Sequence, residues 1–214
     1  MDIITLNSVV PEIFASREKL ASDIWHREVS FERGKSYLVR AESGTGKSSL
    51  CSYLYGQRGD YRGTILFDGM DISRFISEAW SRIRQTQISI LFQELRLFGE
   101  LTAMENVLIK NSIIDFKTKA EIISLFEELG IADKLNSRTE HLSYGQQQRV
   151  ALIRAICQPF SFLLLDEPIS HLDDKNSNIM RDVILREAAK QGAGIIATSI
   201  GKHMNIDYDL CLNL

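Results

Sequence analysis

A short glycine-rich stretch, residues 41–48, carries groups that could hold a polyphosphate. It follows an apolar run at residues 37–39, which predicts a buried strand, and precedes residues 49–54, which predict a helix. Gly44 and Gly46 allow the backbone to curl so that several N–H groups point at one anion. The helix start adds the positive end of its dipole. This order of strand, loop, Lys-Ser pair and helix predicts a loop that binds the phosphates of a nucleotide.

Two side chains complete the chemistry of this loop. The ammonium group of Lys47 can reach the β- and γ-phosphates, and the hydroxyl of Ser48 can ligate Mg²⁺. Ala41 stands where the pattern has glycine, so we expect a slightly altered first turn, because alanine tolerates positive φ poorly. The residues expected to contact the nucleotide are Ser43, Gly44, Thr45, Gly46, Lys47, Ser48 and Ser49. The alternative is an ordinary strand–turn–helix connection, which the Gly-Lys-Ser run argues against.

Carboxylates at the end of a second apolar run could supply the rest of a hydrolytic site. Residues 160–165 form the most apolar run in the chain and lead into Asp166 and Glu167. Open α/β sheets bind ligands at the carboxyl ends of their strands. Asp166 would therefore hold Mg²⁺ through water, and Glu167 would act as a general base on an attacking water. Acidic residues at a strand end can also cap a helix, which is the alternative.

The composition is that of an ordinary globular chain. It has 214 residues, 44% hydrophobic and 25% charged, which suits one α/β domain with a substantial core. A formal net charge of −3 gives no electrostatic footprint for nucleic acid, so we expect no nucleic-acid partner. Three cysteines in apolar surroundings predict buried thiols in a reducing compartment. Since no signal or span-length apolar run is visible, we expect a cytoplasmic protein that reaches the membrane only through a partner.

The elements that must position the loop and the carboxylates alternate between strands and helices. Residues 2–7 predict an edge strand. Residues 24–31 predict a second strand, which a turn at residues 32–35 would join to the strand before the phosphate loop as a β-hairpin. Further short strands are expected at residues 63–69, 88–92, 194–198 and 209–212. The predicted fold class is therefore α/β, with a phosphate-loop core and an antiparallel β element at the N-terminus.

The pattern changes to helices between residues 94 and 142. Apolar side chains recur there at helical spacing, at Ile122, Ile123, Leu125, Phe126 and Leu129. No strand pattern interrupts them. We therefore predict one domain over residues 1–214, with an α/β core at 1–93 and 143–214 and a small helical subdomain inserted at 94–142.

The helix start at residues 142–146 has both a local and a functional interpretation. Ser143, with Gln146 three residues later, predicts a capping box, a good local start for a helix. The same helix start, with Gly145 beside it, offers N–H groups to a phosphate.

The order of these motifs resembles the nucleotide-binding subunits of ATP-binding cassette (ABC) transporters over essentially the whole chain. The matching stretches, in the family's order, are residues 44–48 (Walker A), Gln93 (Q-loop), residues 142–149 (signature motif), residues 163–168 (Walker B) and residues 170–173 (D-loop). The signature motif is specific to this family among phosphate-loop proteins. Tyr144 departs from it, because the family usually has glycine there.

The resemblance implies binding of ATP and Mg²⁺ and hydrolysis of ATP. It implies a head-to-tail homodimer, or a paired cassette, in which Ser143, Gly145 and Gln146 contact the ATP on the other subunit's Walker A loop. The implied metal ligands are Ser48, Gln93 and Asp166, and the implied catalytic groups are Glu167, Gln93 and Ser199. Phe14 is the expected counterpart of the aromatic that stacks on adenine.

The family also implies integral membrane permease subunits as partners, with the chain peripheral on the cytoplasmic face of the membrane. Residues 96–102 match the region that grips a short helix of the membrane subunit. The apolar side chains of this segment could instead pack the junction between the two subdomains, and both interpretations stay open.

A serious departure from the family follows the strand at residues 195–198. The family usually carries a histidine next that contacts the γ-phosphate, and this chain has Ser199. His203 comes four residues later, about one helical turn away, and we expect it to be a solvated surface residue; the alternative is that it replaces the missing histidine. We expect slow basal ATP turnover because serine reaches less far and carries no charge.

The main hypothesis is an ATP-hydrolysing subunit that powers transport through separate membrane subunits by ATP-driven dimer closure. The alternative is the same cassette driving a non-transport conformational signal in a membrane partner. A single cassette of this length resembles the subunits of lipoprotein-release, macrolide-export and cell-division complexes. A soluble cassette acting on nucleic acid is disfavoured by the net negative charge.

Overall fold

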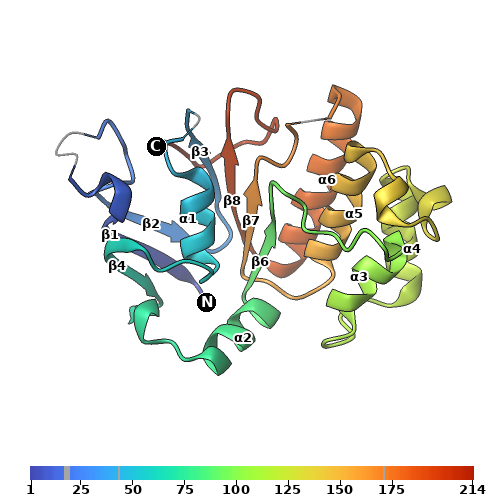
Figure 1. Cartoon of the computed structure of the whole chain (residues 1–214), viewed down its shortest axis with the longest axis horizontal. Coiled ribbons are helices and arrows are strands. Elements are labelled where there is room, and N and C mark those ends of the chain that lie inside the picture. The colour runs from blue at the N-terminus through green and yellow to red at the C-terminus, as the bar shows by residue number, and fades with distance from the viewer. Residues whose placement is uncertain (17–19, 43, 171) are drawn as a thin grey trace.

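Two sheets of different kinds organise the computed structural model, which describes residues 1–16, 20–42, 44–170 and 172–214 (Figure 1). The first sheet is antiparallel, in the order β2-β1-β4-β5. Its strands are β1 (Ile3–Pro11), β2 (Glu28–Glu32), β4 (Tyr61–Phe67) and β5 (Met70–Asp71). The second sheet is parallel, in the order β6-β7-β8-β3-β9. Its strands are β3 (Ser36–Arg40), β6 (Ile88–Leu91), β7 (Phe162–Asp166), β8 (Gly194–Ser199) and β9 (Leu210–Asn213).

The structure confirms the α/β class with an antiparallel N-terminal element and corrects two details of it. Strand β1 is not an edge strand, because it pairs with β2 on one side and β4 on the other. The predicted hairpin is also wrong, since β2 pairs with β1 whereas β3 pairs with β8 and β9. The burial patterns explain the difference. Side chains of β2 alternate between buried and exposed, as suits a sheet with one covered face, whereas the three central residues of β3 are all buried.

Helices cover both faces of the parallel sheet (Figure 1). Helix α1 (Lys47–Leu54) lies between the two sheets, and α5 (Tyr144–Ile156) and α6 (Asp174–Gln191) lie on the opposite face. Helix α2 (Ser77–Thr86) precedes the outer strand β6. All five residues of β7 are buried, as expected for an interior strand of a parallel sheet. This arrangement delivers Asp166 to the carboxyl edge of the sheet.

The chain between β6 and α5 forms α3 (Ala103–Asn111) and α4 (Lys119–Glu128), on the side away from the antiparallel sheet (Figure 1). Each helix begins with a complete capping box, from Thr102 to Glu105 and from Thr118 to Glu121. Buried side chains such as Val107 continue the core that α5 forms with the parallel sheet. The helical character predicted for this segment is therefore present, while its boundaries as a subdomain, 94 and 142, stay a prediction.

A buried ion pair joins the α3–α4 connection to α6. The Lys117 ammonium lies 2.6 Å from the carboxylate of Glu187, and Glu187 is only 2% exposed to solvent. Arg186 and Lys190 contact the other oxygen of that carboxylate at 3.2 and 2.8 Å. Asn111 fixes the Lys117 backbone by bonding both its N–H and its carbonyl group.

Across the described residues, no helix combines the length and the apolar character that crossing a membrane requires.

Candidate functional site

The glycine-rich loop connects β3 to α1 as predicted. Gly44 and Gly46 have φ of 82° and 104°, in the region that side chains disfavour. Ala41 is not one of the described residues with positive φ, so the alteration we expected from its methyl group does not arise from that cause. Its N–H donates to the carbonyl of Ser199 at 3.1 Å, which fixes the loop's entry against the end of β8.

Trp25 packs against the phosphate loop, a contact that the sequence did not predict. Its indole N–H donates to the Thr45 carbonyl at 3.0 Å, and Trp25 is 2% exposed. A Cβ atom added at Gly46 would lie 3.1 Å from the Trp25 ring, so the indole also leaves little room for any larger residue there. The only signal in the sequence is an aromatic residue just before β2.

Lys47 and Glu167 face each other across the site. The Lys47 ammonium donates to the Glu42 carbonyl at 3.0 Å and lies 3.8 Å from the Glu167 carboxylate. Lys47 is 6% exposed. The predicted phosphate-contacting cation and the predicted general base therefore meet at one place.

Thr198 orients both acidic residues at the end of β7. Its hydroxyl donates to Asp166 Oδ1 at 2.7 Å and accepts the Glu167 N–H at 3.4 Å. Asp166 is 5% exposed, so this bond fixes one of its two oxygens. Glu167 has a φ of 51°, which is uncommon for a residue other than glycine. This conformation turns the chain away from the direction of the strand. Sequence analysis missed Thr198, although it stands at the end of the neighbouring strand.

The three predicted metal ligands lie together. Ser48, Gln93 and Asp166 line one cavity of about 170 Å³. A hydroxyl, an amide and a carboxylate offer the oxygen ligands that Mg²⁺ prefers, and the small cavity leaves room for water. These residues fit a magnesium ion. Among the described residues, no three His, Cys, Asp or Glu side chains lie close enough together to hold a metal ion.

The signature helix begins as predicted. Ser143 is the N-cap of α5, and its side chain and that of Gln146 form both bonds of the capping box. The Tyr144 hydroxyl donates to the Gln93 carbonyl at 2.7 Å, a contact across 51 positions that the sequence could not show. A Cβ atom at Gly145 would lie 3.2 Å from Leu172 Cδ2, so this glycine allows the D-loop to approach the helix start.

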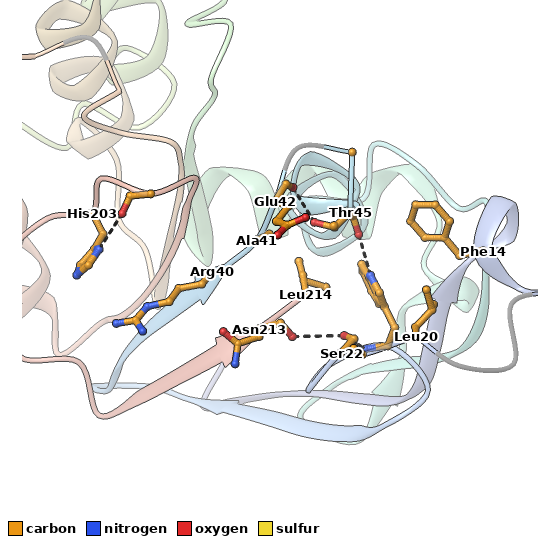
Figure 2. A pocket seen from close by; sticks show the side chains of 14 residues that line it. Phe14, Leu20, Ser22, Arg40, Ala41, Glu42, Thr45, His203, Asn213 and Leu214 are labelled. Carbon is orange, nitrogen blue, oxygen red and sulfur yellow. Dashed lines mark hydrogen bonds between the residues drawn. The ribbon is translucent and has the colours of Figure 1, made fainter.

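A large cavity of about 760 Å³ opens beside the phosphate loop (Figure 2). Phe14 and Leu20 line one end near Thr45, and Arg40 and His203 lie toward the other end. Phe14 is 6% exposed, so only part of its ring is accessible from this cavity. This placement brings the predicted stacking aromatic next to the loop.

Ser199 is already bonded within the chain. Its hydroxyl donates to the Lys202 carbonyl, and Ser199 is 4% exposed. The bond closes a turn after which His203 lines the large cavity, together with Gly44 and Thr45. His203 Nδ1 lies 3.3 Å from the Gly201 carbonyl.

Two further residues of the loop region, Ser43 and Ser49, are expected to contact the nucleotide. Ser43 lies outside the described residues. The Ser49 hydroxyl accepts a hydrogen bond from Arg58 at 2.9 Å, so it ties α1 to the following loop in this structure.

A phosphate loop after β3 and paired acidic residues at the end of β7, on a parallel sheet covered by helices, define a P-loop nucleotide triphosphatase. Comparison with known proteins narrows the class. Residues 26–170 match the family described as ABC transporter.

Curated relatives agree with this match. An uncharacterized ABC transporter ATP-binding protein of Thermotoga maritima is 32% identical over 191 residues, covering 87% of this chain and 81% of that protein. The thiamine import ATP-binding protein ThiQ of Vibrio parahaemolyticus is 34% identical over 177 residues, covering 81% and 73%. The lipoprotein-releasing system ATP-binding protein LolD of Buchnera aphidicola is 32% identical over 161 residues, covering 73% and 69%.

A solved structure has the same fold. The bacterial ABC transporter cassette MJ0796, in its dimeric structure, superposes with a TM-score of 0.78 at 22% identity, covering 92% of this chain and 87% of that one. The chain therefore belongs to the ABC transporter family, as an ATP-binding subunit that hydrolyses ATP.

Proposed function

We propose that two copies of this subunit close on two ATP molecules and that hydrolysis reopens them, which drives a membrane permease. The observation that carries the proposal is the convergence of Lys47, Glu167 and the cavity lined by Ser48, Gln93 and Asp166 at one edge of the sheet.

The residues divide the reaction between holding phosphate and moving a proton. In this structure Lys47 lies 3.8 Å from Glu167, and a bound γ-phosphate would attract the Lys47 ammonium and free that carboxylate. Glu167 then accepts a proton as the water oxygen attacks the γ-phosphorus, and the bond to ADP breaks. A magnesium ion held by Ser48, Gln93 and Asp166 would supply positive charge to the β- and γ-phosphates.

The start of α5 supports the proposed dimer. The N–H groups there, beside the Ser143 hydroxyl, could bind an anion, and the absence of a side chain at Gly145 lets Leu172 approach this helix start. The similar cassette MJ0796 has been solved as a dimer, including a post-hydrolysis state bound to ADP and Pi. We place the ATP of one subunit between its own phosphate loop and the partner's Ser143, Gly145 and Gln146, with its base toward Phe14.

The permease would dock beside the segment at residues 96–102. Phe98 in this segment is 48% exposed, whereas Leu97 packs against the core. The segment could therefore pack the junction and still offer an apolar side chain to a permease. ThiQ and LolD are named as subunits of an import system and a releasing system. A permease partner would hold this chain at the cytoplasmic face of the membrane.

The test separates ATP binding from turnover. Lys47→Ala should weaken ATP binding because it removes a phosphate-contacting charge. Glu167→Gln should keep ATP binding and lower phosphate release by about 10²- to 10⁴-fold, the usual range for a lost general base. Equilibrium binding of labelled ATP and steady-state phosphate release measure the two steps. Glu78→Gln, an exposed carboxylate on α2, is the matched control. Unchanged turnover in Glu167→Gln would show that another group is the base.

A further inference from the structure

Helix α5 is hydrogen-bonded to the chain segment after β6 at two places. We call residues 92–96 the Gln93 segment. At the start of α5, the Tyr144 hydroxyl donates to the Gln93 carbonyl at 2.7 Å. Near the end of α5, the Arg154 guanidinium donates to the carbonyls of Leu95 and Arg96 at 2.5 and 2.6 Å. The backbone of the Gln93 segment is therefore fixed to one helix by three hydrogen bonds.

The Gln93 segment has an unfavourable backbone conformation. Leu95 and Arg96 are consecutive residues with φ of 59° and 50°, which side-chain residues rarely adopt. Such conformations persist where surrounding groups stabilise them, and here the Arg154 guanidinium does so through its hydrogen bonds to the two carbonyls. A strained segment held by a few bonds can change conformation when one of those bonds changes.

The Tyr144 hydroxyl joins two functional parts of the chain. Gln93 lines the predicted magnesium cavity with Ser48 and Asp166. Tyr144 is the first residue of α5 and follows the N-cap Ser143. The hydrogen bond therefore joins Gln93, at the predicted magnesium cavity, to the first residue of α5.

We propose that Tyr144 is a positioning residue that couples the two nucleotide sites of the dimer through its hydrogen bond to the Gln93 segment. The inference rests on the dimer proposed above. Gln93 belongs to the site of its own protomer, whereas the start of α5 completes the site of the other protomer. A change in the Gln93 segment on ATP binding then shifts the helix start that caps the second ATP. Thermodynamic linkage makes the effect mutual.

The experiment compares cooperativity in matched variants. Tyr144→Phe keeps the ring and removes only the hydroxyl. Tyr53→Phe removes a comparable hydroxyl, which donates to the Asp60 carbonyl at 3.0 Å in the connection from α1 to β4. For each protein, steady-state phosphate release is measured against ATP concentration to give a Hill coefficient. ATP binding is measured separately on dilute, monomeric protein.

We expect a Hill coefficient above 1 for the natural protein and for Tyr53→Phe, and a value close to 1 for Tyr144→Phe. The ATP concentration at half-maximal turnover should rise about fivefold in Tyr144→Phe, the lower end of typical coupling between sites. Binding to the monomer should not change. A merely structural role would lower the melting temperature and leave the Hill coefficient alone.

Two results would overturn the inference while leaving the proposed function intact. One is equal cooperativity in Tyr144→Phe and the natural protein, and the other is non-cooperative turnover in the natural protein. Failure of the natural protein to hydrolyse ATP or to dimerise would instead refute the proposed function.

Discussion

At the residue scale, the least conventional part of the predicted site is Ser199, which stands where the family usually has a histidine. Ser199 is buried at the end of β8, and its hydroxyl is bonded to the Lys202 carbonyl. It can reach a phosphate only by giving up that bond. We expect ATP affinity to depend on Lys47 and the backbone of the phosphate loop rather than on the Ser199 hydroxyl. We therefore expect the serine at position 199 to lower the rate of hydrolysis and to leave the affinity for ATP nearly unchanged.

We predict slow turnover with near-normal ATP affinity for the natural protein and faster turnover for Ser199→His. An imidazole reaches farther and can carry a positive charge, so the gain should be on the order of 10²-fold where the turn at residues 199–202 accepts the ring. Steady-state phosphate release and ATP binding are measured side by side. His203→Ala is the companion variant, because His203 lines the cavity beside the loop. Brisk natural turnover that only His203→Ala abolishes would make His203 the sensor.

Sequence reasoning worked where the chemistry is local. The phosphate loop lies within eight residues of a strand end, and the capping box of Ser143 and Gln146 spans one helical turn, so both could be predicted. It failed where partners come from remote segments. The contacts of Trp25 with Thr45, Thr198 with Asp166 and Tyr144 with Gln93 depend on how distant segments pack together, which no local pattern reports.

At the element scale, the α3–α4 connection is fixed to α6 by the pair of Lys117 and Glu187. Burial tends to raise the pKa of Glu187, but its bonds to Lys117, Lys190 and Arg186 outweigh that and lower it to about 2. A depressed carboxyl pKa means that the folded state favours the charged form. The pair therefore stabilises the fold above the ordinary carboxyl range, and the stabilisation is lost as the pH falls from about 4 toward 2.

Glu187→Gln should lower the free energy of unfolding by about 3–5 kcal/mol at pH 7, because it leaves Lys117 buried without its counter-charge. It should also flatten the loss of stability between about pH 4 and pH 2. Urea unfolding at a series of pH values measures both effects. Glu128→Gln is the control, since Glu128 pairs with Arg186 at the surface, and its loss should cost no more than about 1 kcal/mol. Equal losses in the two variants would contradict a structural role for the buried pair.

At the scale of the whole molecule, our proposal needs two copies of the chain to complete one site. The phosphate loop, Glu167 and the cavity lined by Ser48, Gln93 and Asp166 lie at the carboxyl edge of the parallel sheet. In the proposal, the start of α5 serves the site of the other copy. Two copies arranged head to tail would complete two sites at once. Association should therefore depend on ATP, because the bound phosphate provides what each helix start recognises.

The most direct test is the oligomeric state of Glu167→Gln, which should bind ATP without consuming it, measured by sedimentation with and without ATP and Mg²⁺. We predict a monomer without nucleotide and a dimer with it. Adding Gly145→Leu to the same protein should return it to a monomer while ATP still binds, because bulk at Gly145 meets Leu172 and should displace the helix start that the partner's ATP would contact. A dimer that is indifferent to both ATP and Gly145, or a monomer that binds ATP and never associates, would contradict the account.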